Sequence, residues 1–399
     1  MTEHHRPIWD RGEAIDPEML SYTIGDDWLQ DQRLVEHDIA GSLAHVAGLV
    51  HAGLLEDEAG QRISKGLREL LDEYRAGSWQ LTPADEDVHS AVERLLTAKI
   101  GEDGGRMHLG RSRNDQVTVD VRLWLRAASA DAIAATEQLI ASLQELESAH
   151  GSLPLPGYTH LRRAMPSSIG DWLGAHRASF AADLDALRDA QKRGRFCPLG
   201  SGSGYGIPLP LDRGFVAEQL GFDGPEEPVT AVQHGRGRPE LAYLSALEGL
   251  AISLGKLAAD LWLYSSAEFG FVVLPTEFTT GSSLMPQKRN PDLIELLRAQ
   301  CRQVLADRAA LLAVIQDLPS GYHRDFQLIK PPLFRGHDRA LASVRITARL
   351  VPALQFDTET LQQAAADPQL AATAKALQAA AEGGQSFRSA YREEAGSEN

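Results

Sequence analysis

The chain has 399 residues, 43% of them hydrophobic and 24% charged, with a formal net charge of −16 at pH 7. A chain of this length is too long for one ordinary hydrophobic core, which predicts two or three domains or an elongated bundle. The acidic net charge argues against nonspecific binding to DNA, RNA or anionic membranes. The two cysteines, Cys197 and Cys301, lie in no CxxC or Cys/His pattern, so we expect no disulfide framework and no structural zinc, in keeping with a reducing cytoplasm.

The N-terminal region mixes short helical patterns with glycine and proline breaks. Residues 1–16 contain no apolar run, which argues against a secretory signal, and we interpret His4 and His5 as part of a solvated terminus. Apolar residues at helical spacing predict amphipathic helices over residues 31–55, 58–77 and 89–105.

The middle of the chain carries longer helical patterns, over residues 117–151, 167–194, 238–269, 292–319 and 338–354. Several exceed the mean helix length of about 11–12 residues. Apolar stripes of this size favour a bundle, and they favour packing against other copies of the chain over a monomeric bundle. No window of about 18 residues lacks charge, so no transmembrane helix is expected. Strand patterns are sparse, and the Ala- and Gln-rich tail predicts a small helical cap with a disordered end.

Five interrupted segments hold most of the reactive side chains, and each lies at an end of a predicted helix. They are residues 85–93, 108–116, 156–166, 279–295 and 318–330. Because a bundle brings helix ends together, within one chain or between chains, these segments are candidates for one site. Taken singly, each is better explained as a solvated loop or a structural turn.

The segment TTGSSLMPQKRNPDLIE, residues 279–295, contains two breaks, Gly281 and Pro286, that predict a loop rather than a regular helix or strand. A loop can close over a substrate and exclude water. Lys288 and Asn290 offer a charge and amide donors suited to a carboxylate, and a serine hydroxyl beside such cations can act as a base.

The other segments leave alternatives open. His160, between two prolines, can serve as an acid or base but is more often a hydrogen-bonded residue of a helix-entry turn. Residues 108–116 form a basic turn that could bind an anion at a helix start. His89 and Glu93 share a helix face without the HExxH order of a zinc protease, which argues against a metal. The glycine-rich residues 200–206 predict a lid or a close backbone approach rather than a phosphate loop.

Together these segments resemble the fumarase/aspartase superfamily and, within it, the argininosuccinate lyase branch. GSSLMPQKRNPD is similar to the superfamily signature, whereas GRSRNDQV, PGYTHL, DIAGSLAH and SFRSAY are similar to segments of that branch. The resemblance runs from about Trp9 to Tyr391 and so covers nearly the whole chain.

The resemblance implies an all-α fold of three domains: an N-terminal helical domain (1–106), a central long-helix bundle (107–350) and a small C-terminal helical domain (351–399). It implies a homotetramer with a twenty-helix core, in which each active site collects segments from three subunits. It also implies a cytoplasmic enzyme of arginine biosynthesis. Such an enzyme acts on a small molecule without a cofactor or metal, and it has no nucleic-acid or membrane partner.

The implied reaction is an anti elimination that releases fumarate from a succinyl group on nitrogen, giving L-arginine from argininosuccinate. A base removes a proton beside a carboxylate, and donors around the resulting aci-carboxylate lower the barrier. Matched residue by residue, Ser282 is the loop base, His160 the partner acid or base, and Lys288 the group that binds the developing charge. The implied substrate-binding residues are Asp27, His89, Ser112, Arg113, Asn114, Thr159, Asn290, Tyr322, Gln327 and Lys330.

Departures from the branch gather at the end of the implied site that grips the amino acid. Leu109 and Arg162 stand where the branch has threonine and glutamine, and QHGRGRPE near residue 233 replaces SDRDF. Asp27 falls near the position of a substrate-binding serine, and acidic residues are missing after Gln327. The fumarate-releasing end is intact. Two alternatives therefore stand beside the leading one: a related lyase acting on another N-succinyl compound, and a homologue that has lost catalysis.

Overall fold

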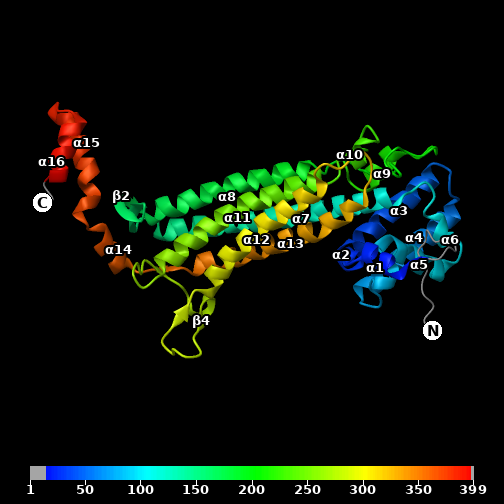
Figure 1. Ribbon diagram of the computed structural model, residues 1–399, viewed down its shortest axis with the longest axis horizontal. Coiled ribbons are helices and arrows are strands. Elements are labelled where there is room, and N and C mark those ends of the chain that lie inside the picture. The colour runs from blue at the N-terminus through cyan, green and yellow to red at the C-terminus, as the bar shows by residue number, and fades with distance from the viewer. Residues whose placement is uncertain (1–14, 397–399) are drawn as a thin grey trace. The chain divides into compact units, whose positions relative to one another are not determined.

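Helices dominate the computed structural model, which describes residues 15–396 (Figure 1). Within that range the named strands form three antiparallel pairings of two strands each. The all-α class expected from the sequence is confirmed. His4 and His5 lie outside the described residues.

The chain divides into two compact units, each assembled from three stretches of sequence. Unit 1 contains the described chain up to Asp131 together with Ala186–Leu247 and Leu305–Asp338, and unit 2 contains the remainder. The boundaries fall inside long helices, so both units contain part of each. These helices are α7 (Arg113–His150), α8 (Ile169–Lys192), α11 (Arg238–Tyr264), α12 (Asp292–Ile315) and α13 (Lys330–Leu350).

Unit 1 also contains shorter helices, and they confirm the amphipathic helices predicted in the N-terminal region. In α4 the buried residues Ala59, Ile63, Leu67 and Leu70 recur three or four residues apart, so one face joins the core. Gly66 lets that face approach α5 closely, because a Cβ there would lie 2.6 Å from Leu96 Cδ1. The shorter helices are α1 (Pro17–Ile24), α2 (Asp27–Asp31), α3 (Val35–His51), α4 (Asp57–Arg75), α5 (Val88–Ile100), α6 (Asp103–Arg106), α9 (Arg213–Gln219) and α10 (Ala231–His234).

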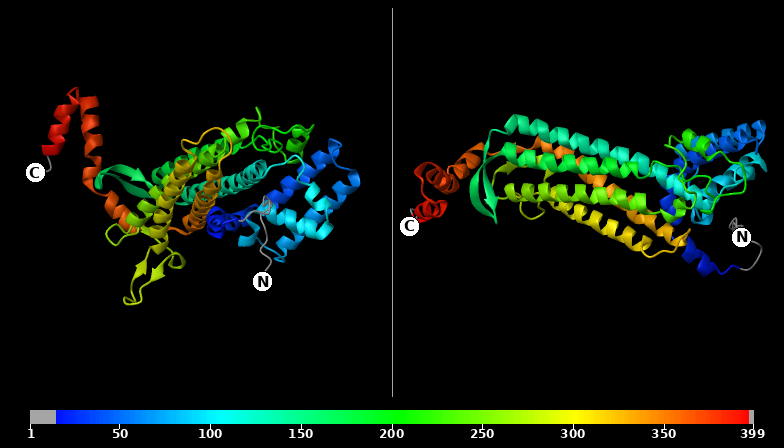
Figure 2. Two further views of the ribbon diagram at one scale, coloured as in Figure 1. Left: turned by 45° about the vertical axis from the view of Figure 1, so that its right-hand side comes forward. Right: turned by 90° about the horizontal axis from the view of Figure 1, so that it is seen from above.

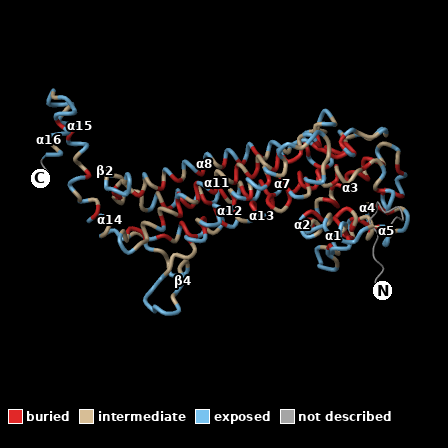
Figure 3. The backbone as a smooth tube through the Cα atoms, in the orientation of Figure 1, coloured by how far each residue is buried: buried red, intermediate tan, exposed pale blue. Residues whose placement is uncertain are grey.

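The long helices begin and end close to the predicted positions, with one exception. α7 ends before Gly151, and α12 begins directly after Pro291, as expected. α13 begins well before the predicted residue 338, because Pro331 and Pro332 occupy its first turn, where no intrahelical N–H is needed. Buried positions recur along all five helices, which marks the faces that form the core (Figure 3).

One helical stretch, Ala231–Tyr264, is long and apolar enough to cross a membrane by length and composition alone. However, 56% of its most apolar window is buried inside the protein. A core helix of a globular protein passes the same test.

Unit 2 contains the strand pairings. β1 (Pro154–Thr159) and β2 (Arg162–Ser168) form a hairpin, β3 (Val272–Val273) pairs with β6 (Gln355–Phe356), and β4 (Thr280–Gly281) pairs with β5 (Arg289–Asn290). The helix-entry turn predicted at His160 is wrong. His160 and Leu161 form the two-residue tip of the hairpin, with φ of 53° and 58°, as in the mirror-image turns that suit the twist of paired strands.

The C-terminal residues of unit 2 form the predicted small helical cap, in which few side chains are buried. Its helices are α14 (Thr358–Ala365), α15 (Ala372–Gly383) and α16 (Phe387–Gly396). α15 and α16 pack side by side in both views of Figure 2, burying Ala376 and Ala390. The last three residues of the predicted disordered end lie outside the described chain.

Candidate active site

Unit 1 contains a cavity of about 170 Å³ that is lined mainly by polar side chains. Four acidic residues, four arginine or lysine residues and one histidine face it, a mixture that suits a ligand carrying both carboxylates and a cation. The lining residues are Asp27, Asp31, Glu86, Asp87, His89, Arg113, Asn114, Val117, Arg236, Tyr322, Arg324, Gln327 and Lys330.

One wall of the cavity is a buried ion cluster around Lys330 at the start of α13. Its Nζ lies 2.6 Å from Asp27 Oδ1 and 2.5 Å from Asp31 Oδ1. Burial acts to lower the pKa of Lys330, but the two carboxylates outweigh it and the pKa is raised. Because one ammonium faces two carboxylates, burial and Asp31 together raise the pKa of Asp27 to about 6 in spite of Lys330.

A second ionic group surrounds Arg113, the first residue of α7. Its guanidinium forms ion pairs with Asp87 and with Glu86, whose Oε1 lies 3.2 Å away. Burial opposes the charge, but these two carboxylates raise the pKa of Arg113. Asp87 is also the N-cap of α5, where its side chain accepts a hydrogen bond from the Ser90 N–H at 2.9 Å. The cap therefore fixes one carboxylate of the cavity in place.

The segment before α13 connects the cavity to the end of α1. Gln327 Nε2 donates to the carbonyl oxygens of Thr23 and Ile24 at 3.1 and 3.0 Å. Arg324 donates to the Thr23 carbonyl at 3.0 Å and to Glu86 Oε1 at 3.2 Å. These bonds hold two cavity side chains in fixed orientations.

Arg236 is a cavity residue that the sequence did not single out. It is buried, and its guanidinium carbon lies 5.6 Å and 5.2 Å from the ring centroids of Tyr322 and Phe326. Its Nε and Nη1 have no hydrogen-bond partner in the described chain. A buried guanidinium held by two rings with free donors is suited to bind a carboxylate. The only signal was that Arg236 is one of two arginines in QHGRGRPE, a segment that departs from the branch.

The start of α7 is anchored by the glycine-rich segment. Asp115 accepts backbone N–H groups from Gly200 and Gly202 at 3.0 and 2.8 Å on Oδ2, and from Ser112 at 2.9 Å on Oδ1. Gly200 and Gly202 have φ of 85° and 60°, a conformation that favours glycine. The predicted close backbone approach at residues 200–206 is confirmed. It fixes the helix start that presents Asn114 to the cavity.

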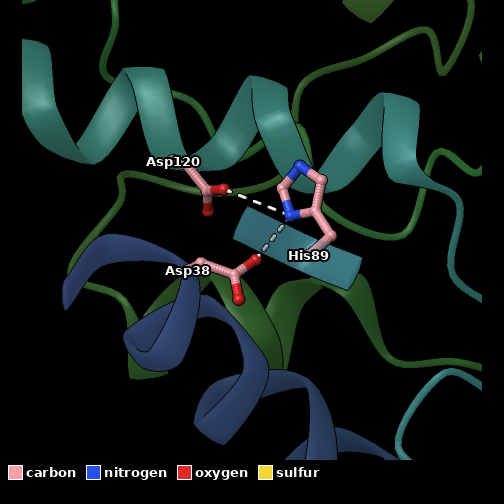
Figure 4. Close-up of side chains that lie close together, drawn as sticks. All are labelled: Asp38, His89 and Asp120. Carbon is pink, nitrogen blue, oxygen red and sulfur yellow. Dashed lines mark hydrogen bonds and ion pairs between the residues drawn. The ribbon is translucent and has the colours of Figure 1, made fainter. Parts of the chain in front are cut away.

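His89, on α5, lies between the cavity and two buried carboxylates. Its Nδ1 is 2.7 Å from Asp38 Oδ1 and 3.6 Å from Asp120 Oδ2 (Figure 4). The three ligand-type atoms lie within 4.8 Å of one another. The contact to Asp38 has hydrogen-bond length, and the Arg111 guanidinium and Lys330 ammonium both act on Asp120. These charges favour a bound proton over a cation at this position.

The three predicted catalytic residues, Ser282, His160 and Lys288, all belong to unit 2, and none of them lines the cavity of unit 1. His160 and Thr159 are exposed at the hairpin. The segment with Ser282 is an exposed loop whose ends are joined by the β4–β5 pairing, a short strand pair that the sequence did not predict. Ser282 Oγ accepts backbone N–H groups from Leu284 and Met285 at 3.3 and 3.0 Å.

The structure thus gathers seven predicted residues from distant segments in one cavity: Asp27, His89, Arg113, Asn114, Tyr322, Gln327 and Lys330. Ser112 lies beside them, with its Oγ accepting the Asn114 N–H at 3.2 Å. Ser282, Lys288, Asn290, Thr159 and His160 are placed separately, in unit 2. Asp31, Glu86, Asp87, Val117, Arg236 and Arg324 were not singled out as site residues, although Glu86, Asp87 and Arg324 fall inside the predicted reactive segments.

Comparison with known proteins identifies the family. A family model described as a lyase matches residues 15–306. A relative from Sorangium cellulosum named argininosuccinate lyase is 44% identical over 96% of this chain and 89% of its own. The chain belongs to the argininosuccinate lyase family. A second argininosuccinate lyase, from Xylella fastidiosa, is 41% identical over 96% of this chain and 86% of its own.

Solved structures agree with this family in fold. An EDDS lyase variant with bound fumarate superimposes with a TM-score of 0.84, at 25% identity, over 96% of this chain and 76% of that chain. A class II fumarase from Schistosoma mansoni superimposes with a TM-score of 0.78, at 19% identity, over 97% of this chain and 92% of that chain. The fumarase/aspartase-type architecture expected from the resemblance to argininosuccinate lyases is confirmed.

Proposed function

We propose that this protein is a carbon–nitrogen lyase that eliminates fumarate from argininosuccinate and releases L-arginine. The observation that carries the proposal is the cavity of unit 1, where family-matched residues from four distant segments meet. Its mixed charges suit a substrate that has several carboxylates and a guanidinium-derived cation. The identity of 44% over nearly the whole chain to an argininosuccinate lyase supports the same substrate.

In this proposal Ser282 is the base that removes the proton beside the substrate carboxylate. The two backbone N–H groups that point at its Oγ stabilise the hydroxyl oxygen once it is deprotonated. Lys288 and Asn290 then stabilise the extra negative charge of the aci-carboxylate. His160 acts as the partner acid or base. In the acid role it gives a proton to the leaving nitrogen, which keeps the electron pair of the broken C–N bond.

The cavity residues hold the substrate for this step. Asn114, Ser112 and Arg113, with Thr159 from unit 2, bind the succinyl carboxylates, and His89 lies beside them. Tyr322, Gln327 and Lys330, with Asp27, bind the amino-acid end. No cofactor or metal enters the chemistry, because the acid, the base and the charge stabilisation all come from side chains.

We further propose a cytoplasmic homotetramer of arginine biosynthesis, in which three subunits contribute to each active site. Apolar side chains on the long helices support the assembly: Ile252, Trp262 and Leu296 are 52%, 41% and 63% exposed in the single chain. The three-domain division at residues 106 and 350 stays part of this proposal. The twenty-helix core would cover these exposed side chains.

A related lyase for another N-succinyl compound is the second candidate, and Asp27 favours it. Its carboxylate is bound to Lys330 at the amino-acid end of the cavity, where the branch has a serine. One experiment separates the two candidates: the ultraviolet absorbance of fumarate is followed after the purified protein is mixed with argininosuccinate, and then with other N-succinyl amino acids. Turnover of argininosuccinate that Ser282→Ala removes supports the first candidate. Turnover of another compound alone supports the second.

A further inference from the structure

Two buried carboxylates lie directly behind His89, and the roles described so far leave both unused. Asp38 comes from α3 and Asp120 from α7, so three helices meet at the imidazole ring of α5 (Figure 4). The side chains of Asp38 and Asp120 are each 1% exposed, and that of His89 is 5% exposed. Water therefore cannot supply the solvation that these groups lose on folding.

The carboxylates lack the hydrogen bonds that normally accompany a buried charge. Asp38 Oδ2 and both oxygens of Asp120 have no hydrogen-bond partner in the described chain. Asp38 Oδ1 is hydrogen-bonded to His89 Nδ1. Such a pair requires a nearby proton or positive charge, and the His89 ring is within reach of both carboxylates.

The charges around the cluster determine where that proton lies. Burial acts to lower the pKa of His89, but Asp38, Asp87 and Asp31 outweigh it and the pKa is raised. Burial and Asp38 raise the pKa of Asp120 well above its usual range. The charged and titratable groups that face the cluster from the surrounding elements are Asp31, Asp87, Glu93, His108, Arg111, Arg113 and Lys330.

We propose that Asp38 and Asp120 are positioning residues that hold His89 as an imidazolium, with its Nε2–H edge left to donate a charged hydrogen bond to a substrate carboxylate. The Nδ1 edge faces the carboxylates, while His89 also lines the cavity, so the opposite edge of the ring is the one available to a ligand. A charged donor binds a carboxylate about twice as strongly as a neutral one. The identity of that carboxylate rests on the proposed lyase function.

The first test measures the charge of His89 directly, by nitrogen NMR of protein labelled at histidine. The chain has 13 histidines, and His89→Gln identifies the signal by removing it. We expect His89 to be charged at pH 7 in the wild-type protein. Asp38→Asn should lower its pKa by about 1–3 units, because an opposite charge within hydrogen-bond distance is lost, and Asp120→Asn should lower it by less.

Glu93→Gln is the matched control, because it removes a partly buried carboxylate four residues along the same helix without a contact to His89. It should lower the pKa of His89 by much less than Asp38→Asn does, because Glu93 is not among the charges that dominate the pKa of His89. A wild-type His89 that is neutral at pH 7 would overturn the proposal even if Asp38→Asn failed to fold. So would a pKa that stays the same in both aspartate variants.

The second test asks whether the charged edge meets a ligand. Fumarate added to the wild-type protein should move the His89 Nε2 signal, and it should bind at least about tenfold more weakly to Asp38→Asn at a pH where that variant has a neutral His89. An unmoved signal would refute the donor role. Because fumarate binding and the NMR titration do not need turnover, a protein that fails to cleave argininosuccinate but gives both results would contradict the lyase proposal alone.

Discussion

The cavity of unit 1 and the serine loop of unit 2 are built in opposite ways. The cavity is walled by buried ion pairs, such as Lys330 with Asp27 and Asp31, that are fixed before any ligand arrives. The loop is exposed, and the hydrogen bonds of the Ser282 hydroxyl within the described chain come from the two backbone N–H groups of the same loop named above. In the proposed reaction, the fixed charges of the cavity bind the substrate, while the base belongs to a separate, exposed loop.

The sharpest test of this division is Ser282→Ala. We expect kcat to fall by about 10²–10⁴-fold, because the base is lost, while the thermal unfolding temperature stays the same because the side chain is on an exposed loop. Fumarate release and a thermal scan measure the two properties. Ser283→Ala, which removes the neighbouring hydroxyl, is the control. A Ser282→Ala enzyme with most of its kcat would show that the loop does not supply the base.

The sharing of sites between subunits can be tested by mixing two inactive variants. His160→Asn and Lys288→Met are both expected to be inactive alone. After joint unfolding and refolding, mixed tetramers should regain a fraction of wild-type activity, because some sites then receive only intact segments. Each variant refolded alone is the control. No regained activity in tetramers shown to be mixed would mean that a site takes both residues from one subunit.

Lys330→Met should lower the free energy of unfolding of the protein, because it removes the cation of the ion cluster in the cavity of unit 1. Removal of the ammonium leaves Asp27 and Asp31 buried without their cation, which costs about 3–5 kcal/mol of unfolding free energy. Denaturant unfolding at neutral pH measures this loss. The double variant Asp27→Asn/Lys330→Met should recover part of it. If Lys330→Met is as stable as the wild-type protein, the cluster is more solvated than the structure indicates.

Asp27→Asn should have the smallest effect, and it depends on pH. The pKa of Asp27 is raised to about 6 in the folded protein, so the folded state binds this proton more strongly than the unfolded chain. Its contribution to stability is therefore present at about pH 4 and lost as the pH rises towards 6. The variant should show a flatter stability curve across that window, by up to about 3 kcal/mol. Asp72→Asn, at an exposed position of α4, should leave the curve unchanged.

Much of the site was predictable because its residues lie at helix ends in short, chemically dense segments. The segments that contain Asn114, Gln327 and Lys330 were identified in this way. The resemblance to the argininosuccinate lyase branch then singled out these three residues, and the structure brings them together. Arg236 was missed because a single arginine between glycines carries no local signal. Its role depends on the rings of Tyr322 and Phe326, which lie about ninety residues further along the chain.

The local structure around two reactive segments was also decided by tertiary contacts. His160 lies between prolines, which suggested a helix entry, yet the segment pairs with itself as a hairpin. The two-residue pairing of Thr280–Gly281 with Arg289–Asn290 is too short to leave a periodic pattern. Short strands form only when the rest of the fold brings their backbones together.

By itself, the sequence determined the all-α class, the helix boundaries at Gly151 and Pro291, and the segments that carry the chemistry, because helical periodicity and helix breakers act within a few residues. The tertiary structure alone decided which side chains became buried neighbours. Asp38, His89 and Asp120 are ordinary polar residues of three separate helices until those helices pack and exclude water. Burial then turns them into a coupled cluster, because the cost of an isolated charge is set by its surroundings and not by its place in the chain.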